Sequence, residues 1–321
     1  MSNRRDFLKS ASLLTAGGLL AGKAQAMPVS AMQAAPVTTA NKALGLQIYS
    51  LFNELYDDLP KRLAELKDMG YINLELAGYN SGKIGQVDMM EFKKMAEDAG
   101  LKLVSSHVNP PGNSPQEFFL MNYTRDQLPR VKEFWKAAAD DHAKLGCKYL
   151  LQPMMPTVKN HDDAALIGEF FNEAGKICKE AGLQYGYHDH NWEFKKVATE
   201  EQIKKAHPFM EPGDPIEDLF IANTDPSLVI FELDVYWTVR GGADPLEYMQ
   251  KYPDRIRVLH IKDRAVLGQS GLLNFQNIFN QMYANGIQDY FVELEKMPDG
   301  RSQMVGIKEC ADYLQNAPFV K

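Results

Sequence analysis

The sequence predicts a parallel (β/α)8 barrel, and three observations support this fold class. From residue 43 onward, eight short apolar runs alternate with segments of helical periodicity. Such alternation is typical of parallel sheets with right-handed helical crossovers. The runner-up fold, a doubly wound open sheet, lacks support because the chain has no GxGxxG or other phosphate-binding glycine loop. We therefore expect residues 43–321 to form one barrel domain, a size that such barrels commonly reach.

The predicted strands are short apolar runs, as expected for strands that are buried on both faces. Several of them end at a polar residue, where the β-branched residues stop. In chain order the strands are residues 44–49, 72–76, 101–107, 149–152, 183–188, 229–234, 256–261 and 290–294.

The predicted helices follow the strands, and several are closed by a glycine, which is a common helix stop. In chain order they are residues 59–69, 88–99, 125–145, 162–181, 245–251, 275–284 and 304–315. Residues 191–225 break this rhythm and contain three prolines. We expect an insertion there, with a short helix at residues 216–222.

The first 26 residues have the features of a twin-arginine export signal and are set apart from the fold. Arg4 and Arg5 begin a basic region, an apolar stretch covers residues 13–21, and residues 24–26 form a small-x-small cleavage pattern. The apolar stretch is too short and too rich in glycine to span a bilayer. We therefore expect a flexible leader at residues 27–42, a periplasmic protein exported in the folded state, and no stable membrane insertion of the mature chain.

The charge balance argues against nucleic acid as a partner. The formal net charge of the full chain is −7, and the predicted signal contributes four basic residues and one acidic residue. Removing a net charge of +3 leaves the mature chain at −10. An acidic surface of this kind repels phosphate backbones. The sequence leaves open whether the chain forms homo-oligomers.

Polar residues lie where two neighbouring apolar strands end. Asp234 closes the run 229–234, and His260 lies at the end of the run 256–261. The carboxyl ends of parallel barrel strands meet at one rim, where barrel enzymes hold their catalytic groups. A carboxylate oxygen and an imidazole nitrogen at one rim suit a divalent ion such as Mn, Co, Zn or Mg.

Two further strands end in pairs of ionisable residues. His188 and His190 are two residues apart and share one side of an extended chain, as do Glu293 and Glu295. One histidine at a strand end is most often a polar cap, but ionisable residues at the ends of four apolar strands are hard to explain as caps. Buried carboxylates without partners are also costly. The pattern therefore predicts a catalytic divalent metal site.

The motifs that carry these residues resemble those of the sugar phosphate isomerase/epimerase group, whose members have a xylose isomerase-like TIM barrel. The resemblance covers about residues 44–314. In strand order its motifs are LGLQIYS, LELAGY, SSH, YHDHNWEF, TDPSLVIFELDVYW, HIKD and YFVELE. The resemblance implies one divalent metal ion held by His188, Asp234, His260 and Glu293.

The resemblance also implies a small-carbohydrate pocket around this metal. Family positions that line the substrate pocket or support the metal ligands fall on His107, His190, Glu193, Trp237, Lys262 and Glu295. Of these, His107, Trp237, Lys262 and Glu295 are the expected substrate-binding residues.

The implied activity is isomerisation or epimerisation of a sugar, by proton abstraction next to a carbonyl through an enediolate. Glu293, or a neutral His190, is expected to take the proton. One departure bears on this activity. Epimerases of the group look as though they use two glutamate ligands, one on each face of the sugar, and His188 stands where one of them is expected. Symmetric two-base epimerisation would then need Glu193 or His190 as the second base.

Two other functions remain open on the sequence. The same intermediate permits β-elimination, and some branches of the family resemble metal-dependent lyases that cleave 3-keto-glycosides. An exported protein is better placed to meet a keto-glycoside than a phosphorylated cytoplasmic sugar. The other alternative is a non-catalytic periplasmic sugar-binding barrel that keeps the metal-site residues for ligand capture.

Overall fold

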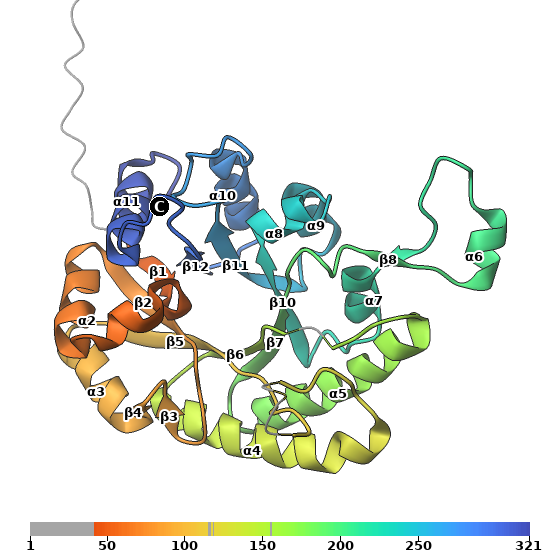
Figure 1. Ribbon diagram of the computed structural model, residues 1–321, viewed down its shortest axis with the longest axis horizontal. Coiled ribbons are helices and arrows are strands. Elements are labelled where there is room, and N and C mark those ends of the chain that lie inside the picture. The colour runs from red at the N-terminus through yellow and green to blue at the C-terminus, as the bar shows by residue number, and fades with distance from the viewer. Residues whose placement is uncertain (1–41, 115–116, 118, 155) are drawn as a thin grey trace, which may run out of the picture. The chain divides into compact units, whose positions relative to one another are not determined.

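Figure 1 shows the computed structural model, which describes residues 42–114, 117, 119–154 and 156–321. The predicted export signal and residues 27–41 of the predicted leader lie outside the described residues. Within the described ranges, no helix is both long enough and apolar enough to cross a bilayer.

Eight parallel strands close into the barrel that the sequence predicts. Around the barrel, the strands are β1 (Leu44–Gln47), β2 (Tyr71–Leu76), β5 (Lys102–His107), β6 (Tyr149–Gln152), β7 (Gln184–His188), β10 (Val229–Asp234), β11 (Ile256–Lys262) and β12 (Asp289–Glu293). Strand β12 then pairs with β1 and closes the sheet. Each predicted strand is present, and its ends differ from the prediction by no more than two residues.

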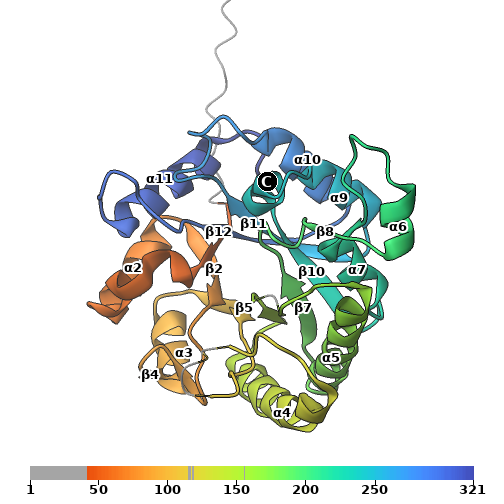
Figure 2. The same ribbon diagram turned by 45° about the vertical axis from the view of Figure 1, so that its right-hand side comes forward.

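Helices surround this barrel, as the turned view shows (Figure 2). They are α2 (Leu59–Asp68), α3 (Met89–Asp98), α4 (Leu128–Leu145), α5 (His161–Glu180), α6 (Glu200–Lys205), α7 (Ile216–Ala222), α8 (Val235–Arg240), α9 (Pro245–Lys251), α10 (Phe275–Ala284) and α11 (Gln303–Asn316). Short 3-10 segments cover Ile48–Tyr56 and Arg125–Gln127. All of the predicted helices are present, including the short one at residues 216–222.

The barrel interior has an apolar floor beneath a polar layer. Alternate residues of a barrel strand point inward. The floor is a separate buried cluster of Tyr149, Leu151, Ile230, Val258 and Phe291. Two residues further along β10, β11 and β12, on the same face, come Glu232, His260 and Glu293. The polar side chains therefore lie toward the carboxyl ends of the strands, above a buried apolar floor.

Two connections at the carboxyl ends of the strands differ from the prediction. Strand β1 stops at Gln47 because its side chain accepts a hydrogen bond from the backbone N–H of Tyr49 and begins a 3-10 turn. Helix α8 starts directly after Asp234, whose Oδ1 accepts the backbone N–H groups of Tyr236 and Trp237. Asp234 therefore ends one element and caps the next.

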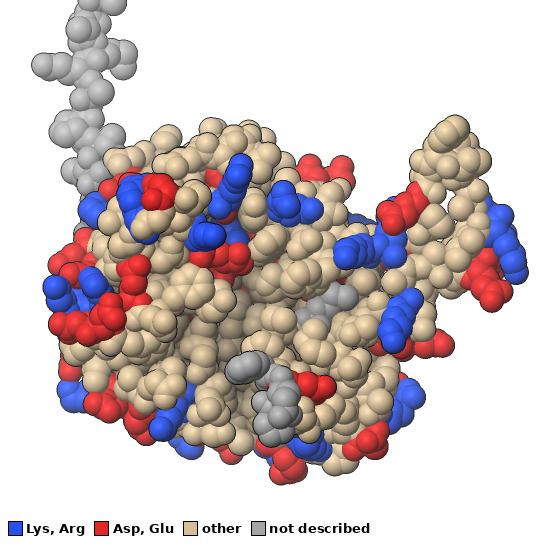
Figure 3. Space-filling view, in the orientation of Figure 1, with Lys and Arg blue, Asp and Glu red and all other residues tan. Residues whose placement is uncertain are grey.

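The predicted insertion contains a small antiparallel ribbon. Strand β8 (Lys196–Val197) pairs with β9 (Asp214–Pro215), and α6 lies between them. Figure 1 shows this segment projecting from the side of the barrel. The space-filling view in the same orientation shows acidic and basic side chains interspersed, with no broad stripe of basic residues on this face (Figure 3).

Candidate metal centre

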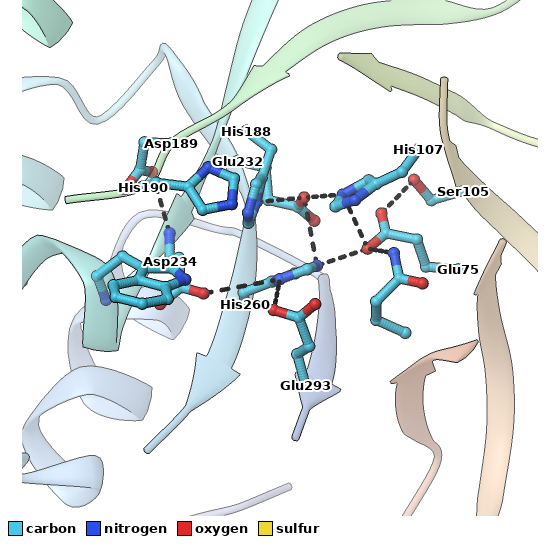
Figure 4. Close-up of polar contacts among 12 residues, drawn as sticks. Glu75, Ser105, His107, His188, Asp189, His190, Glu232, Asp234, His260 and Glu293 are labelled. Carbon is cyan, nitrogen blue, oxygen red and sulfur yellow. Dashed lines mark hydrogen bonds and ion pairs between the residues drawn. The ribbon is translucent and has the colours of Figure 1, made fainter. Parts of the chain in front are cut away.

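Four side chains from four strands converge at the carboxyl ends of the barrel strands. They are the four predicted metal ligands, His188 of β7, Asp234 of β10, His260 of β11 and Glu293 of β12 (Figure 4). One nitrogen or oxygen atom of each lies within 4.8 Å of the others, and all four residues are buried. The structure thus brings the predicted ligand set together.

Strand register explains why these side chains meet. Asp234 is the direct neighbour of His260 in the β10–β11 pair, and Glu293 pairs with Lys262 in the β11–β12 pair. The Nδ1 atom of His260 lies 3.8 Å from Asp234 Oδ2 and 3.4 Å from Glu293 Oε2. One imidazole nitrogen therefore faces two carboxylates.

Three atoms of the group are buried without a hydrogen-bond partner in the described part of the chain, which tests whether a cation fits. They are His188 Nδ1, Asp234 Oδ2 and His260 Nδ1. Leaving such atoms unpartnered is costly, and coordination to a divalent ion would satisfy the two that face each other, Asp234 Oδ2 and His260 Nδ1. Two imidazoles and two carboxylates also form a donor set that Mn, Co or Zn accepts. The residues present fit a divalent ion.

The pKa values of the two carboxylates shift in opposite directions. Burial raises the pKa of Asp234 to about 6, although Lys262 and His260 act in the opposite direction. Burial also acts to raise the pKa of Glu293, but Lys262 and His260 outweigh it and hold that pKa well below its usual value. Glu293 is therefore an anion at neutral pH.

His188, the last residue of β7, and His190, two residues beyond it, are neutral because they are buried. Burial, followed by the nearby His260 and His107, lowers the pKa of His188 well below its usual value. A neutral imidazole is the form that binds a metal. Burial likewise lowers the pKa of His190 to about 3.

His190 lies beside the four-residue group. Its ring packs edge-on against His188 at 4.8 Å and stacks on Trp192 at 5.2 Å. Its Nδ1 atom is buried, with no hydrogen-bond partner among the described residues. His190 thus offers a neutral ring with a free nitrogen at the edge of the candidate centre.

Lys262 is a buried cation beside Glu293. Its Nζ atom lies 2.7 Å from Glu293 Oε2, 2.5 Å from Glu295 Oε1 and 3.9 Å from Asp234 Oδ2. It also lies 4.9 Å from the centre of the Trp237 ring. The predicted substrate residues Lys262, Trp237 and Glu295 therefore form one contiguous wall next to the predicted ligands.

Glu193 points elsewhere, although it was predicted as a catalytic residue. One carboxylate oxygen accepts the Tyr187 hydroxyl at 2.5 Å, and the other accepts the backbone N–H of His190 at 2.9 Å. The Tyr187 ring packs on Phe171 and Phe220, in the layer between strands and helices. Glu193 therefore stabilises the turn that carries His190, and both of its carboxylate oxygens are engaged outside the four-residue group.

A deeper polar layer contains functional candidates that sequence reasoning missed. Glu232 Oε2 lies 2.8 Å from His107 Nε2, 3.0 Å from His188 Nδ1 and 3.3 Å from His260 Nε2. Burial, followed by Glu75, raises the pKa of Glu232 to about 7. The sequence contains part of the information needed to recognise Glu232. Glu232 precedes Asp234 by two residues, so both side chains lie on the inward face of β10.

The fold and this buried group define a (β/α)8 barrel protein with a candidate divalent-cation centre at the carboxyl ends of its strands. Residues 63–316 match the xylose isomerase-like TIM barrel family. The chain belongs to this family, a family of sugar isomerases and epimerases.

Individual relatives agree with this assignment. A crystal structure of a sugar phosphate isomerase/epimerase from Parabacteroides distasonis is 60% identical, covers 87% of this chain and 100% of that chain, and has a TM-score of 0.83. A second such structure from that organism is 46% identical, with coverage of 89% and 100% and a TM-score of 0.82. An inosose dehydratase from Geobacillus kaustophilus is 24% identical over 217 residues, which span 63% of this chain and 60% of that protein.

Proposed function

We propose that this protein is a divalent-metal-dependent sugar isomerase or epimerase that removes a proton from the carbon next to a carbonyl. The observation that carries the proposal is the buried group of two imidazoles and two carboxylates, with two unpartnered atoms facing each other across β10 and β11. The 60% identical relative from Parabacteroides distasonis, a sugar phosphate isomerase/epimerase, supports the isomerase or epimerase part of the proposal.

His188, Asp234, His260 and Glu293 would hold the ion. When bound, it supplies a Lewis acid that polarises a carbonyl or hydroxyl oxygen and acidifies the neighbouring C–H. Preorganised charges of this kind stabilise the negative charge that develops on the oxygen.

The chain's own groups supply the proton acceptor and its surroundings. Glu293 is ionised at neutral pH and accepts the proton, and Lys262 at 2.7 Å keeps that carboxylate in place. His190 is neutral and accepts or returns a proton on a second side of the sugar. Trp237 and Glu295 form one wall with Lys262. His107 of β5 lies in the deeper polar layer, 2.8 Å from Glu232, where its ring stacks on that of His260 at 5.2 Å.

A second candidate function is a lyase that acts by β-elimination on a keto sugar such as a 3-keto-glycoside. Two observations favour it. Glu193, one of the two proposed second bases, is engaged by Tyr187 and His190 rather than by the candidate centre. Curated relatives of this chain include inosose dehydratases, which are named for the removal of water from an inosose. In β-elimination, a base removes one α-proton and the β-substituent then leaves. This reaction needs a base on only one face of the sugar, whereas two-base epimerisation needs one on each face.

Proton NMR in deuterated water separates the two functions. Metal-loaded protein is incubated with a panel of ketoses, keto-glycosides and inososes. Deuterium at a stereocentre, with every C–O bond intact, supports the isomerase, whereas release of water or aglycone supports the lyase. If the protein holds metal and no substrate of the panel exchanges a proton, both proposals fail.

We also propose that the protein acts in the periplasm after export by the twin-arginine pathway. The support is the arrangement of Arg4, Arg5, the apolar stretch and the small residues at 24–26.

A further inference from the structure

A carboxylate from the opposite side of the barrel interior contacts the Nε2 atom of His260, the ring nitrogen that faces away from Asp234 and Glu293. The Nε2 atom of His260 lies 2.5 Å from Glu75 Oε2, and both side chains are fully buried. Strand β2, which carries Glu75, is separated from β11 by β1 and β12 in the barrel order. This contact therefore crosses the barrel, as Figure 4 shows.

Glu75 is itself fixed at both oxygens. Ser105 Oγ donates to Glu75 Oε1 at 2.6 Å, and Gln47 Nε2 donates to Glu75 Oε2 at 2.8 Å. These two residues come from β5 and β1, the neighbours of β2 on either side, and neither is exposed. Three strands thus position one carboxylate against one imidazole.

The contact with Glu75 determines which nitrogen of His260 remains available to bind a metal ion. A histidine that ligates a metal through one nitrogen commonly donates its other N–H to a carboxylate, which fixes the ring and its tautomer. In His260 the Nε2 atom is engaged by Glu75, while Nδ1 is the unpartnered atom that faces Asp234 and Glu293.

Glu232 does not replace Glu75 in this role. It lies 3.3 Å from His260 Nε2 but only 2.8 Å from His107 Nε2, with which it forms a hydrogen bond. Glu75 Oε2 also lies 3.2 Å from His107 Nε2, farther than from His260 Nε2, so each of the two buried glutamates lies nearest to a different histidine. A glutamate with several polar partners is also unusual at a buried core position, where an apolar side chain would pack equally well.

We propose that Glu75, held by Ser105 and Gln47, is a positioning residue that orients His260 through Nε2 and thereby sets how tightly the candidate centre binds a divalent cation. The proposal rests on the proposed function for the cation itself. It assigns Glu75 no contact with a substrate and no part in proton transfer.

The competing arrangement is a second cation in the deeper group. His107, His188, Glu232 and His260 also offer one ligand atom each within 4.8 Å of one another. A cation there would take the Nε2 lone pair of His260, so Nε2 could no longer donate to Glu75. The two arrangements therefore predict opposite protonation of the same atom and different numbers of ions per chain.

Isothermal titration calorimetry of Mn²⁺ into the metal-free full chain tests the proposal. Glu75→Gln is expected to weaken Mn²⁺ binding by about 10- to 100-fold, as the loss of a carboxylate that supports a histidine ligand typically does. Ser105→Ala, which keeps the charge and frees one oxygen, is expected to act in the same direction by a smaller factor. Glu217→Gln is the matched control, because Glu217 is a similarly buried glutamate on α7, outside the barrel strands. The Mn²⁺ affinity of this variant is expected to equal that of the wild type.

Two readouts do not depend on affinity. In Zn²⁺-loaded protein, long-range ¹H–¹⁵N NMR of His260 should show a protonated Nε2, and elemental analysis should find one ion per chain. An unchanged Mn²⁺ affinity in folded Glu75→Gln, an unprotonated Nε2, or two ions per chain would each overturn the proposal. If Glu75→Gln fails to fold, Ser105→Ala and the wild-type spectrum still decide.

A failure of the cation site itself has a different signature. If wild-type protein binds no divalent ion, the proposed function loses its centre. The orientation of His260 by Glu75 would then still be visible in the metal-free spectrum as a hydrogen-bonded Nε2 proton that Glu75→Gln removes. Absence of that proton in the metal-free wild type would overturn the positioning role separately.

Discussion

Asp234 and His260 are direct neighbours across the β10–β11 pair, and Asp234 Oδ2 lies 3.8 Å from His260 Nδ1. The relationship is set by backbone pairing, because a slip of one residue would turn either side chain to the opposite face of its strand. Asp234 also caps α8 through its other oxygen. The two oxygens of one carboxylate thus have separable roles, and substitutions can tell them apart.

We expect Asp234→Asn and Asp234→Ala to lose divalent-ion binding together with turnover, since both remove a charged ligand. They should differ in stability. Asparagine keeps Oδ1 as the acceptor for the first N–H groups of α8, whereas alanine removes the cap, at a cost of about 1 kcal/mol in the free energy of unfolding. Titration calorimetry with Mn²⁺ and chemical unfolding of the metal-free proteins measure the two effects.

The same pair separates an enzyme from a non-catalytic sugar-binding barrel. A barrel that binds sugar through its walls alone should keep sugar affinity in Asp234→Asn, because the cap and the fold persist. Retained sugar binding together with an absence of turnover in the wild type would support the binding protein and count against the enzyme.

The pH dependence of stability gives a second prediction for Asp234. Burial raises its pKa from 3.8 to about 6, so the folded state binds the proton more tightly than the unfolded state does. The stability that this proton contributes is present at low pH and is lost as the pH rises through about 6. A shift of about two pKa units corresponds to about 3 kcal/mol. Asparagine does not titrate, so metal-free Asp234→Asn should gain stability relative to the wild type, by up to about that amount, between about pH 4 and pH 7.

Urea unfolding of both metal-free proteins across this range checks the sign. Other buried groups titrate in the same window, but they are common to both proteins and largely cancel in the difference. A difference that stays flat with pH would mean that Asp234 is ionised in the folded metal-free protein. Saturating Mn²⁺ should reverse the order at neutral pH, because only the wild type gains binding energy.

For His260, the prediction concerns metal content. Protein purified without chelators should carry about one divalent ion per chain, and His260→Ala should carry none, since the substitution removes the nitrogen that faces both carboxylates. Elemental analysis of both proteins measures this. His142→Ala is a suitable control, because His142 is equally buried but bonds to Ser106 and to the Ala138 carbonyl, away from the candidate centre. A metal-free wild type would refute the proposed cofactor.

The strand ends could be predicted from the sequence because an ionisable residue that closes an apolar run stands out locally. Asp234 and Glu293 are of this kind, and barrel topology alone implies that they share a rim. The register that makes Asp234 the direct neighbour of His260 is not specified by the sequence and comes from the structure. Periodicity and glycine stops were equally local signals, which is why the eight strands and the major helices could be predicted.

Glu75 could not be recognised in the same way because its meaning depends on barrel closure. Its partner His260 lies 185 residues away, on a strand that is not its neighbour. The orientation of Glu193 was equally hidden. Its predicted catalytic role came from the family resemblance, which does not give the direction of a side chain in a turn, and its carboxylate contacts Tyr187 and the backbone N–H of His190. The position of a loop residue in the sequence does not determine whether its side chain points into the barrel or toward the outer helices.

Export can be tested independently of the chemistry. Lysine at positions 4 and 5 keeps the positive charge but removes the arginine pair, so the double substitution Arg4→Lys with Arg5→Lys should retain the precursor in the cytoplasm. Lys23→Arg, outside the pair, should leave export unchanged. Cell fractionation and N-terminal sequencing measure both effects, and mature protein beginning at Met27 is expected in the periplasm. Equal export of the double variant and the wild type would contradict the twin-arginine assignment.

The last prediction concerns the division of labour between Glu293 and Glu193. Glu293 is an anion that faces the candidate centre, so Glu293→Gln should lower kcat/KM by about 10²- to 10⁴-fold, the range expected for loss of a general base. Glu193→Gln removes an acceptor from the backbone N–H of His190 but leaves an oxygen for Tyr187, so its loss of activity should be smaller and accompanied by lower thermal stability. Deuterium exchange into the substrate isolates proton abstraction from later steps. If Glu193→Gln abolishes exchange as completely as Glu293→Gln does, without loss of metal or stability, then Glu193 reaches the substrate and is the second base.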